Sequence, residues 1–126
     1  MSAYLDTQVA VWLAQSNLKR ISRAAQEQME KTNLLISPMV FMEMEYLYEI
    51  RKIMLRAEEV RVKLEYELGA KICTFSFPKI ADVAIHEKWT RDPFDRLIVA
   101  QAKANGLSPL ISADSHIQDN YARAVW

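Results

Sequence analysis

The chain has 126 residues, of which 51% are hydrophobic and 25% are charged, a balance that is typical of compact globular proteins and excludes a disordered or collagen-like chain. Sixteen basic residues match sixteen acidic ones, and this zero net charge excludes the strong positive field of proteins that coat nucleic acid duplexes. We therefore expect a single domain over residues 1–126, in which any affinity for nucleic acid is local.

The first half of the chain alternates apolar runs with helical patterns. In chain order we expect a strand, two helices, a second strand and a long helical region broken near Ala57, over residues 2–5, 9–13, 22–31, 34–36 and 38–68. Val9, Trp12 and Leu13 have the i, i+3, i+4 spacing of one helix face. Ser37 and Pro38 form a good N-cap and first-turn pair, so we expect the long helical region to begin there.

The second half continues the alternation. In chain order we expect a strand, two helices, a strand, a short helix and an edge strand, over residues 71–75, 79–88, 93–106, 110–111, from 114 onward and 124–126. Asp92 and Pro93 open the second of these helices. Because strands and helices alternate, the sequence predicts an α/β fold with a parallel sheet and helices on both of its faces.

Several residue types are too scarce for common cofactor sites. With Gly69 and Gly106 as the only glycines, neither a glycine-rich dinucleotide turn nor a Walker loop can be written. The single cysteine, Cys73, and the two histidines, His86 and His116, cannot build a disulfide, a multi-cysteine site or a three-histidine zinc centre. A metal ion, if one is used, must therefore be held by oxygen ligands.

Neither a membrane span nor a secretion signal is predicted. No apolar stretch reaches the roughly 18 residues that a membrane helix requires. The first residues lack a basic region before an apolar one and carry Asp6 instead. We expect a cytoplasmic protein without membrane contact.

Acidic residues follow the predicted strands with unusual regularity. Asp6 comes directly after the first strand, Asp95 lies in the first turn of the helix at 93–106, and Asp114 follows the strand at 110–111. Each could simply be a helix N-cap, which stabilises a helix by about 1 kcal/mol. However, ligands of open parallel sheets bind at the carboxyl ends of the strands. Capping does not require convergence on one sheet edge, so we favour a functional role.

Glu43 is a carboxylate in an apolar row. The row continues with Leu47, Ile50 and Met54, which predicts that Glu43 faces the core, whereas Glu45 lies in a charged row that predicts a solvated face. A buried carboxylate needs a partner. An internal ion pair with an arginine and a metal site both satisfy this requirement, and both interpretations stay open.

Four carboxylates without cysteine or histidine form a site for a hard cation, Mg²⁺ or Mn²⁺. Such ions serve phosphoryl chemistry, because they polarise a phosphodiester and make an attacking water more acidic. The nearby helix N-termini would also favour a phosphate. The residues thus point to hydrolysis of phosphodiester bonds.

Four sequence strings resemble PIN domains, and most closely the VapC-type ribonuclease toxins of type II toxin–antitoxin pairs. In chain order they are Tyr4-Leu5-Asp6-Thr7, Ile36-Ser37-Pro38 leading to Glu43, Arg91-Asp92-Pro93-Phe94-Asp95-Arg96-Leu97-Ile98-Val99-Ala100-Gln101-Ala102, and Leu110-Ile111-Ser112-Ala113-Asp114. This resemblance implies a three-layer α/β/α sandwich with a mostly parallel central sheet. It also implies a Mg²⁺- or Mn²⁺-dependent endoribonuclease that cleaves RNA, pairs with a small cognate antitoxin protein and forms a homodimer.

The resemblance also assigns site residues. The acidic quartet, expected to be catalytic and to bind the metal, consists of Asp6, Glu43, Asp95 and Asp114. Ser112 stands where such proteins commonly have threonine. Asp92 is an ideal N-cap before Pro93, and we expect it to support the metal ligands without binding the metal itself. Arg91 and Arg96 are well placed to meet RNA phosphates, although Arg96 could equally pair with Glu43 or Asp92.

Two other classes of protein share part of this pattern. A phosphoacceptor receiver domain also gathers carboxylates at a sheet edge, but it requires a lysine after its last strand, where this sequence has Val125 and Trp126. A non-catalytic PIN-like module that binds RNA or protein would keep the shape and lose some of the acids, and all four are present. We expect the three tryptophans and Cys73 in the core, and His116 in a surface or packing role.

Overall fold

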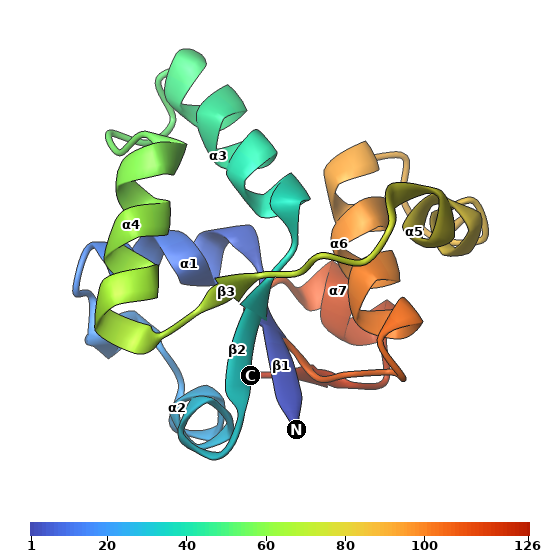
Figure 1. The fold of residues 1–126 in the computed structure, drawn as a ribbon, viewed down its shortest axis with the longest axis horizontal. Helices are drawn as coiled ribbons and strands as arrows, with labels where there is room; N and C mark the ends of the chain where they lie inside the picture. Colours follow the sequence, from blue (N-terminus) through green and yellow to red (C-terminus); the bar gives the residue numbers. More distant parts are fainter.

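A fully parallel sheet of five strands forms the centre of the computed structural model, which describes residues 1–126 (Figure 1). The strands, in chain order, are β1 (Ser2–Leu5), β2 (Asn33–Ile36), β3 (Lys71–Ile72), β4 (Leu110–Ile111) and β5 (Ala124–Val125). Their order across the sheet is β3-β2-β1-β4-β5. The central strand β1 is therefore paired on both edges, with Tyr4 opposite Leu35 of β2 and Leu110 of β4.

Seven α-helices and one short 3₁₀ helix connect the strands. They are α1 (Thr7–Ala14), η1 (Leu18–Arg20), α2 (Arg23–Lys31), α3 (Pro38–Glu49), α4 (Ala57–Leu68), α5 (Phe77–Ala84), α6 (Pro93–Ala104) and α7 (Ser115–Asn120). Figure 1 shows α1, α2 and α4 on one side of the sheet and α5, α6 and α7 on the other, with α3 rising beyond the strand ends. From β1 the chain adds β2 and β3 toward one edge of the sheet, and it then crosses back to add β4 and β5 toward the other edge. Because the crossovers are right-handed, the helices that connect strands in these two directions lie on opposite faces of the sheet. The predicted three-layer α/β/α fold is confirmed.

The structure corrects three predicted boundaries. The strand predicted over 71–75 is only two residues long, because Cys73 makes the last hydrogen bond to β2, from its N–H to the Ile36 carbonyl at 2.9 Å. Helix α5 begins before the predicted residue 79 because Ser76 caps it, with its Oγ accepting from the Lys79 N–H at 3.4 Å, and it ends at Ala84. The long helical region is interrupted before Ala57, where α4 begins as expected, but the break already starts after Glu49, and Arg51 within it adopts a left-handed conformation with φ of 63°.

The hydrophobic core joins the sheet to both helix layers in one cluster of 25 buried residues. Cys73 is buried, as expected, and its Sγ accepts a hydrogen bond from the Tyr4 hydroxyl at 3.1 Å. Trp12, Trp89 and Trp126 are only half-buried, so they cover the core from its rim and do not fill it. None of the helices combines the length and the apolar composition needed to cross a bilayer.

A largely buried ion pair fixes α6 to the loop before it. Glu87 is 3% exposed, and its carboxylate lies 2.5 Å from the Lys103 ammonium and accepts from the Trp89 indole N–H at 2.6 Å. A buried carboxylate that loses its only cation keeps the cost of desolvation without compensation.

We predict that Lys103→Met, which keeps the apolar stem of the side chain, lowers the free energy of unfolding by about 2–3 kcal/mol in urea titrations. The matched control is Arg23→Met in α2, because Arg23 and its partner Glu27 have side chains that are 94% and 57% exposed. Exposed pairs contribute little, so the control should change stability by less than about 0.5 kcal/mol. Equal losses in the two variants would contradict a special role for the buried pair.

Candidate metal centre

A cleft of about 350 Å³ opens at the carboxyl end of β1. Its lining combines four carboxylates with a small number of polar and apolar side chains, namely Asp6, Thr7, Gln8, Trp12, Glu43, Leu47, Asp95, Ala113 and Asp114. All four residues of the expected acidic quartet thus line one cleft, although they come from four different segments of the chain. A larger hollow of about 840 Å³ lies over the outer face of α4, away from these acids.

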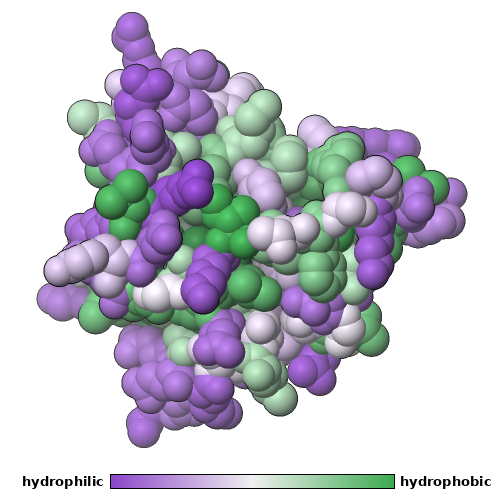
Figure 2. Space-filling view, in the orientation of Figure 1, coloured by the Kyte–Doolittle hydropathy of each residue, from purple (hydrophilic) through white to green (hydrophobic).

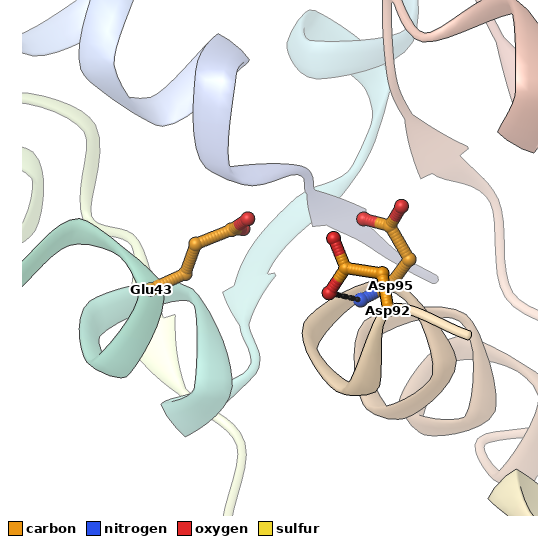
Figure 3. Close-up of side chains that lie close together, drawn as sticks. All are labelled: Glu43, Asp92 and Asp95. Carbon is orange, nitrogen blue, oxygen red and sulfur yellow. Dashed lines mark hydrogen bonds between the residues drawn. The ribbon is translucent and has the colours of Figure 1, made fainter. Parts of the chain in front are cut away.

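Three carboxylates approach one another most closely. Glu43, Asp92 and Asp95 each place an oxygen within 4.8 Å of the others. Figure 3 shows Glu43 reaching from α3 toward Asp92, the N-cap of α6, and Asp95 in the first turn of α6. This trio includes Asp92, which was expected to support the metal ligands without binding the metal itself.

Asp92 has two roles available at once. Its Oδ1 caps α6 by accepting from the N–H groups of Phe94 at 2.8 Å and Asp95 at 3.4 Å. Its carboxylate nevertheless belongs to the close trio. Because a carboxylate has two oxygens and about four acceptor positions, capping does not exclude metal binding.

Asp6 is held by two donors in the interior. The residue is 6% exposed, and its oxygens accept from the Thr7 N–H at 2.8 Å and from the Ser112 hydroxyl at 2.7 Å. Burial raises the pKa of Asp6, with a smaller contribution from the nearby carboxylates of Asp114 and Asp92, and the two hydrogen bonds oppose this shift. Asp6 is therefore fixed in position by the fold itself.

Ser112 connects Asp6 to the outer part of the cleft. It is fully buried, and its Oγ also accepts from the Asp114 N–H at 3.1 Å. Asp114 is exposed and caps α7, accepting from the N–H groups of His116 at 2.8 Å and Ile117 at 3.3 Å. His116 is exposed and contacts the Trp89 ring edge-on, with 5.2 Å between the ring centroids.

The interpretation of Glu43 as one half of an ion pair with arginine is wrong. The structure contains three ion pairs, and none involves Glu43. Its Oε1 instead accepts a hydrogen bond from the Thr7 hydroxyl. Arg96 forms an ion pair with neither Glu43 nor Asp92, and its Nε donates to the Thr90 carbonyl at 2.8 Å.

The helical row that begins at Glu43 also needs correction. Ile50 and Met54, expected to face the core, are 43% and 89% exposed because α3 ends at Glu49 and the chain turns away. Glu43 itself is half-buried at the cleft wall. Glu45 behaves as expected for a charged face, since it pairs with Arg56 at 2.6 Å outside the cleft.

The cleft concentrates negative charge without a neutralising cation. Burial, and then the neighbouring carboxylates, raise the pKa of Glu43 and of Asp95 to about 7 each. For Glu43, the hydrogen bond from Thr7 opposes the shift. Asp95 has no hydrogen-bonding partner for its carboxylate. A set of close carboxylate oxygens that are costly to ionise together fits a hard divalent cation.

Comparisons with known proteins agree with this geometry. A family model for the PIN domain matches residues 3–123. The chain belongs to the PIN domain family. No match was found among curated protein sequences. Among solved structures, this PIN domain is similar to a chain in the crystal structure of VapBC2 from Rickettsia felis bound to a DNA fragment from their promoter. The TM-score is 0.62 and the identity 19%, over 95% of this chain and 93% of the other, so the likeness shows a shared fold.

Two polar residues that line the cleft of this PIN domain, Thr7 and Gln8, were not predicted from the sequence as part of the site. Thr7 belongs to one of the strings that carry the resemblance, but its hydroxyl contact with Glu43 joins residues 36 positions apart and leaves no local pattern. Gln8 precedes Trp12 by one helical turn on α1, and both line the cleft. Gln8 is two positions from Asp6, which is not the spacing of residues on one helix face, so the sequence carries no signal for it.

We predict that the metal-free PIN domain loses stability as the pH rises. The raised pKa values of Glu43 and Asp95 mean that the folded state binds more protons than the unfolded state between about pH 4 and 7, so stability is highest below this window and is lost through it. In chelator, the melting temperature should fall from pH 5.5 to pH 8. Asp95→Asn should reduce this fall and raise the melting temperature at pH 8 by about 3–5 °C.

The control for this experiment is Asp82→Asn, on the exposed face of α5, which should leave the pH profile unchanged. Saturating Mg²⁺ or Mn²⁺ should stabilise the wild type more than Asp95→Asn, by mass action. A flat wild-type profile without a metal-dependent shift would contradict the interpretation of Glu43 and Asp95 as strained ligands of a metal ion.

Proposed function

We propose that this PIN domain is a Mg²⁺- or Mn²⁺-dependent endoribonuclease and the toxin of a VapC-type toxin–antitoxin pair. The observation that carries the proposal is the set of carboxylates that four separate segments contribute to one cleft. The trio of Glu43, Asp92 and Asp95 lies close together, and Asp6 and Asp114 line the same cleft. Membership of the PIN family and the fold shared with the VapBC2 chain support the assignment.

The residues that would hold the ion are the trio, together with Asp6 and Asp114. When bound, the ion supplies a Lewis acid that polarises the phosphodiester and makes an attacking water more acidic. The fold supplies rigid placement, because Asp6, Asp92 and Asp114 are each fixed by hydrogen bonds from backbone N–H groups. Carboxylates that are already oriented lose little conformational entropy on binding the metal.

Two helix N-termini and two arginines near the cleft would contact the cleaved phosphate and the neighbouring phosphates of the RNA. Helices α1 and α6 begin at its wall, after Asp6 and Asp92, and their N-termini carry partial positive charge that favours a phosphate. Arg91 is exposed beside the start of α6 and Arg96 is half-buried in its first turns. We assign these two arginines to contacts with RNA phosphates on either side of the cleaved bond.

The size of the cleft favours flexible RNA as the substrate. A volume of about 350 Å³ is at the lower end of the range for small-molecule pockets, so a splayed nucleotide enters more readily than a stacked duplex. Sequence-specific recognition of RNA generally uses unpaired loops and ends. A single-stranded segment of a structured RNA satisfies both requirements.

A cognate antitoxin follows from the same proposal. The structural neighbour is a VapBC2 assembly, and in this chain apolar side chains are exposed along α3 and just after it, beside the cleft. They are Met42 (63%), Tyr46 (47%), Ile50 (43%) and Met54 (89%). Figure 2 shows hydrophobic residues over this part of the surface, between hydrophilic regions. An amphipathic antitoxin helix would cover them and could direct a basic side chain to the acids.

We predict that the purified protein cuts RNA in Mg²⁺ or Mn²⁺ and stops in chelator. Neutralising any residue of the quartet should lower the rate by about 100-fold or more, as expected for loss of a metal ligand. The variants are Asp6→Asn, Glu43→Gln, Asp95→Asn and Asp114→Asn. The matched control is Glu45→Gln, since Glu45 lies on the same helix as Glu43 and pairs with Arg56 outside the cleft.

Wild-type cleavage rates for Asp95→Asn would overturn the proposed assignment of that residue. Absence of cleavage by the wild type, with RNA binding retained, would support the alternative of a non-catalytic PIN-like module.

For the antitoxin, we predict that the tagged chain co-purifies with a small protein when both are expressed from the native host. Tyr46→Glu should release this partner, because a charge would be buried in an apolar interface, and should leave RNA cleavage by the free protein intact. Recovery of no small protein at any expression level would contradict the predicted pairing. Lys63→Glu, on α4 and outside this surface, is a matched charge-changing control.

A further inference from the structure

Thr7 contacts two of the site carboxylates at once. Its backbone N–H donates to Asp6 Oδ1 at 2.8 Å, and its hydroxyl donates to Glu43 Oε1. The residue is 4% exposed, so water competes poorly for either bond. One residue at the start of α1 thereby connects the carboxylate that follows β1 with the one that α3 contributes.

The hydroxyl of Thr7 is free for this contact because of its place in the helix. Inside a helix, a threonine hydroxyl commonly bonds to the carbonyl one turn earlier. Thr7 is the first residue of α1, and the preceding residues form β1, so no helical carbonyl precedes it. Its β-branched side chain has few rotamers, which makes the donor direction well defined.

Glu43 depends on this donor. No cation lies in an ion pair with it, and Thr7 supplies its only hydrogen bond from the protein. The bond occupies Oε1 and leaves Oε2 without a protein partner. Without the hydroxyl, a long glutamate side chain on a helix that extends beyond the sheet would be free to turn toward solvent.

We propose that Thr7 is a positioning residue of the metal centre, which holds the Glu43 carboxylate in the group with Asp92 and Asp95 so that the three can bind one divalent ion. This role rests on the metal-binding part of the proposed function. Thr7 acts through Glu43, because its hydroxyl donates to that carboxylate. Groups that orient metal ligands in this way typically contribute 10–100-fold to metal affinity.

The test compares the Mn²⁺ affinities of purified variants, measured by electron paramagnetic resonance of the free ion. Thr7→Val removes the hydroxyl and keeps the β-branched shape, and it should weaken Mn²⁺ binding by about 10- to 100-fold. Thr7→Ala should do the same without adding a methyl group to a packed site. Thr7→Ser restores a donor and should return the affinity close to that of the wild type.

Two controls separate positioning from a general structural effect. Thr32→Val removes a threonine hydroxyl outside the site, one that donates to the Gln28 carbonyl at 2.7 Å, and should leave Mn²⁺ affinity unchanged. On a Glu43→Gln background, Thr7→Val should add little further loss, because the two changes act through one contact. Melting temperatures of all variants identify any that are unfolded at the assay temperature.

Wild-type Mn²⁺ affinity in a folded Thr7→Val or Thr7→Ala protein would overturn the proposal, as would full additivity with Glu43→Gln or failure of Thr7→Ser to restore binding. A wild type that binds no Mn²⁺ would overturn it as well. A wild type that binds Mn²⁺ but cuts no RNA would overturn the nuclease assignment alone, and the comparison of the Thr7 variants would still decide the role of this residue.

Discussion

Repulsion among carboxylates that the fold forces together is the constraint on which the rest of this site depends. Helices α1 and α7 begin close behind β1 and β4 at one edge of the sheet, and the N-terminus of α6, which follows α5, packs at the same edge. Asp6, Asp92 and Asp114 therefore meet although they are far apart in sequence. Charges about 5 Å apart repel by roughly 3 kcal/mol at an effective dielectric of about 20. The protein tolerates this cost because each of these carboxylates also accepts hydrogen bonds from backbone N–H groups.

Capping and metal binding are therefore compatible, and treating them as competing explanations was the main error at the level of sequence. An aspartate at an N-cap is oriented by helix N–H groups that its first oxygen accepts, while its second oxygen is free to face the cleft. Asp92 shows this most clearly, since it caps α6 and belongs to the trio with Glu43 and Asp95. Residue type alone predicted the cap, and only the geometry revealed that the Asp92 carboxylate also lies close to those of Glu43 and Asp95.

The fold was predictable because its signals are local. Apolar runs, Ser-Pro and Asp-Pro starts, and the alternation of strand and helix specify elements within a few residues. The sequence-based predictions failed where contacts between elements determine the structure. The end of α3 at Glu49 is followed by a left-handed Arg51 that no sequence pattern predicted. Because the helix ends there, Ile50 and Met54 of the row that begins at Glu43 are exposed. The Thr7–Glu43 hydrogen bond likewise depends on how α1 and α3 pack, which spacing within either helix does not determine.

The strand order has a consequence for the order in which the protein can be completed during synthesis. The central strand β1 is made first, yet one of its two neighbours, β4, is among the last segments to leave the ribosome. Until then β1 has an open edge, Ser112 cannot reach Asp6, and Asp114 is absent from the cleft. A nascent or truncated chain therefore carries most of the acidic residues without an assembled cleft, so translation itself delays the meeting of all these carboxylates until the chain is nearly finished.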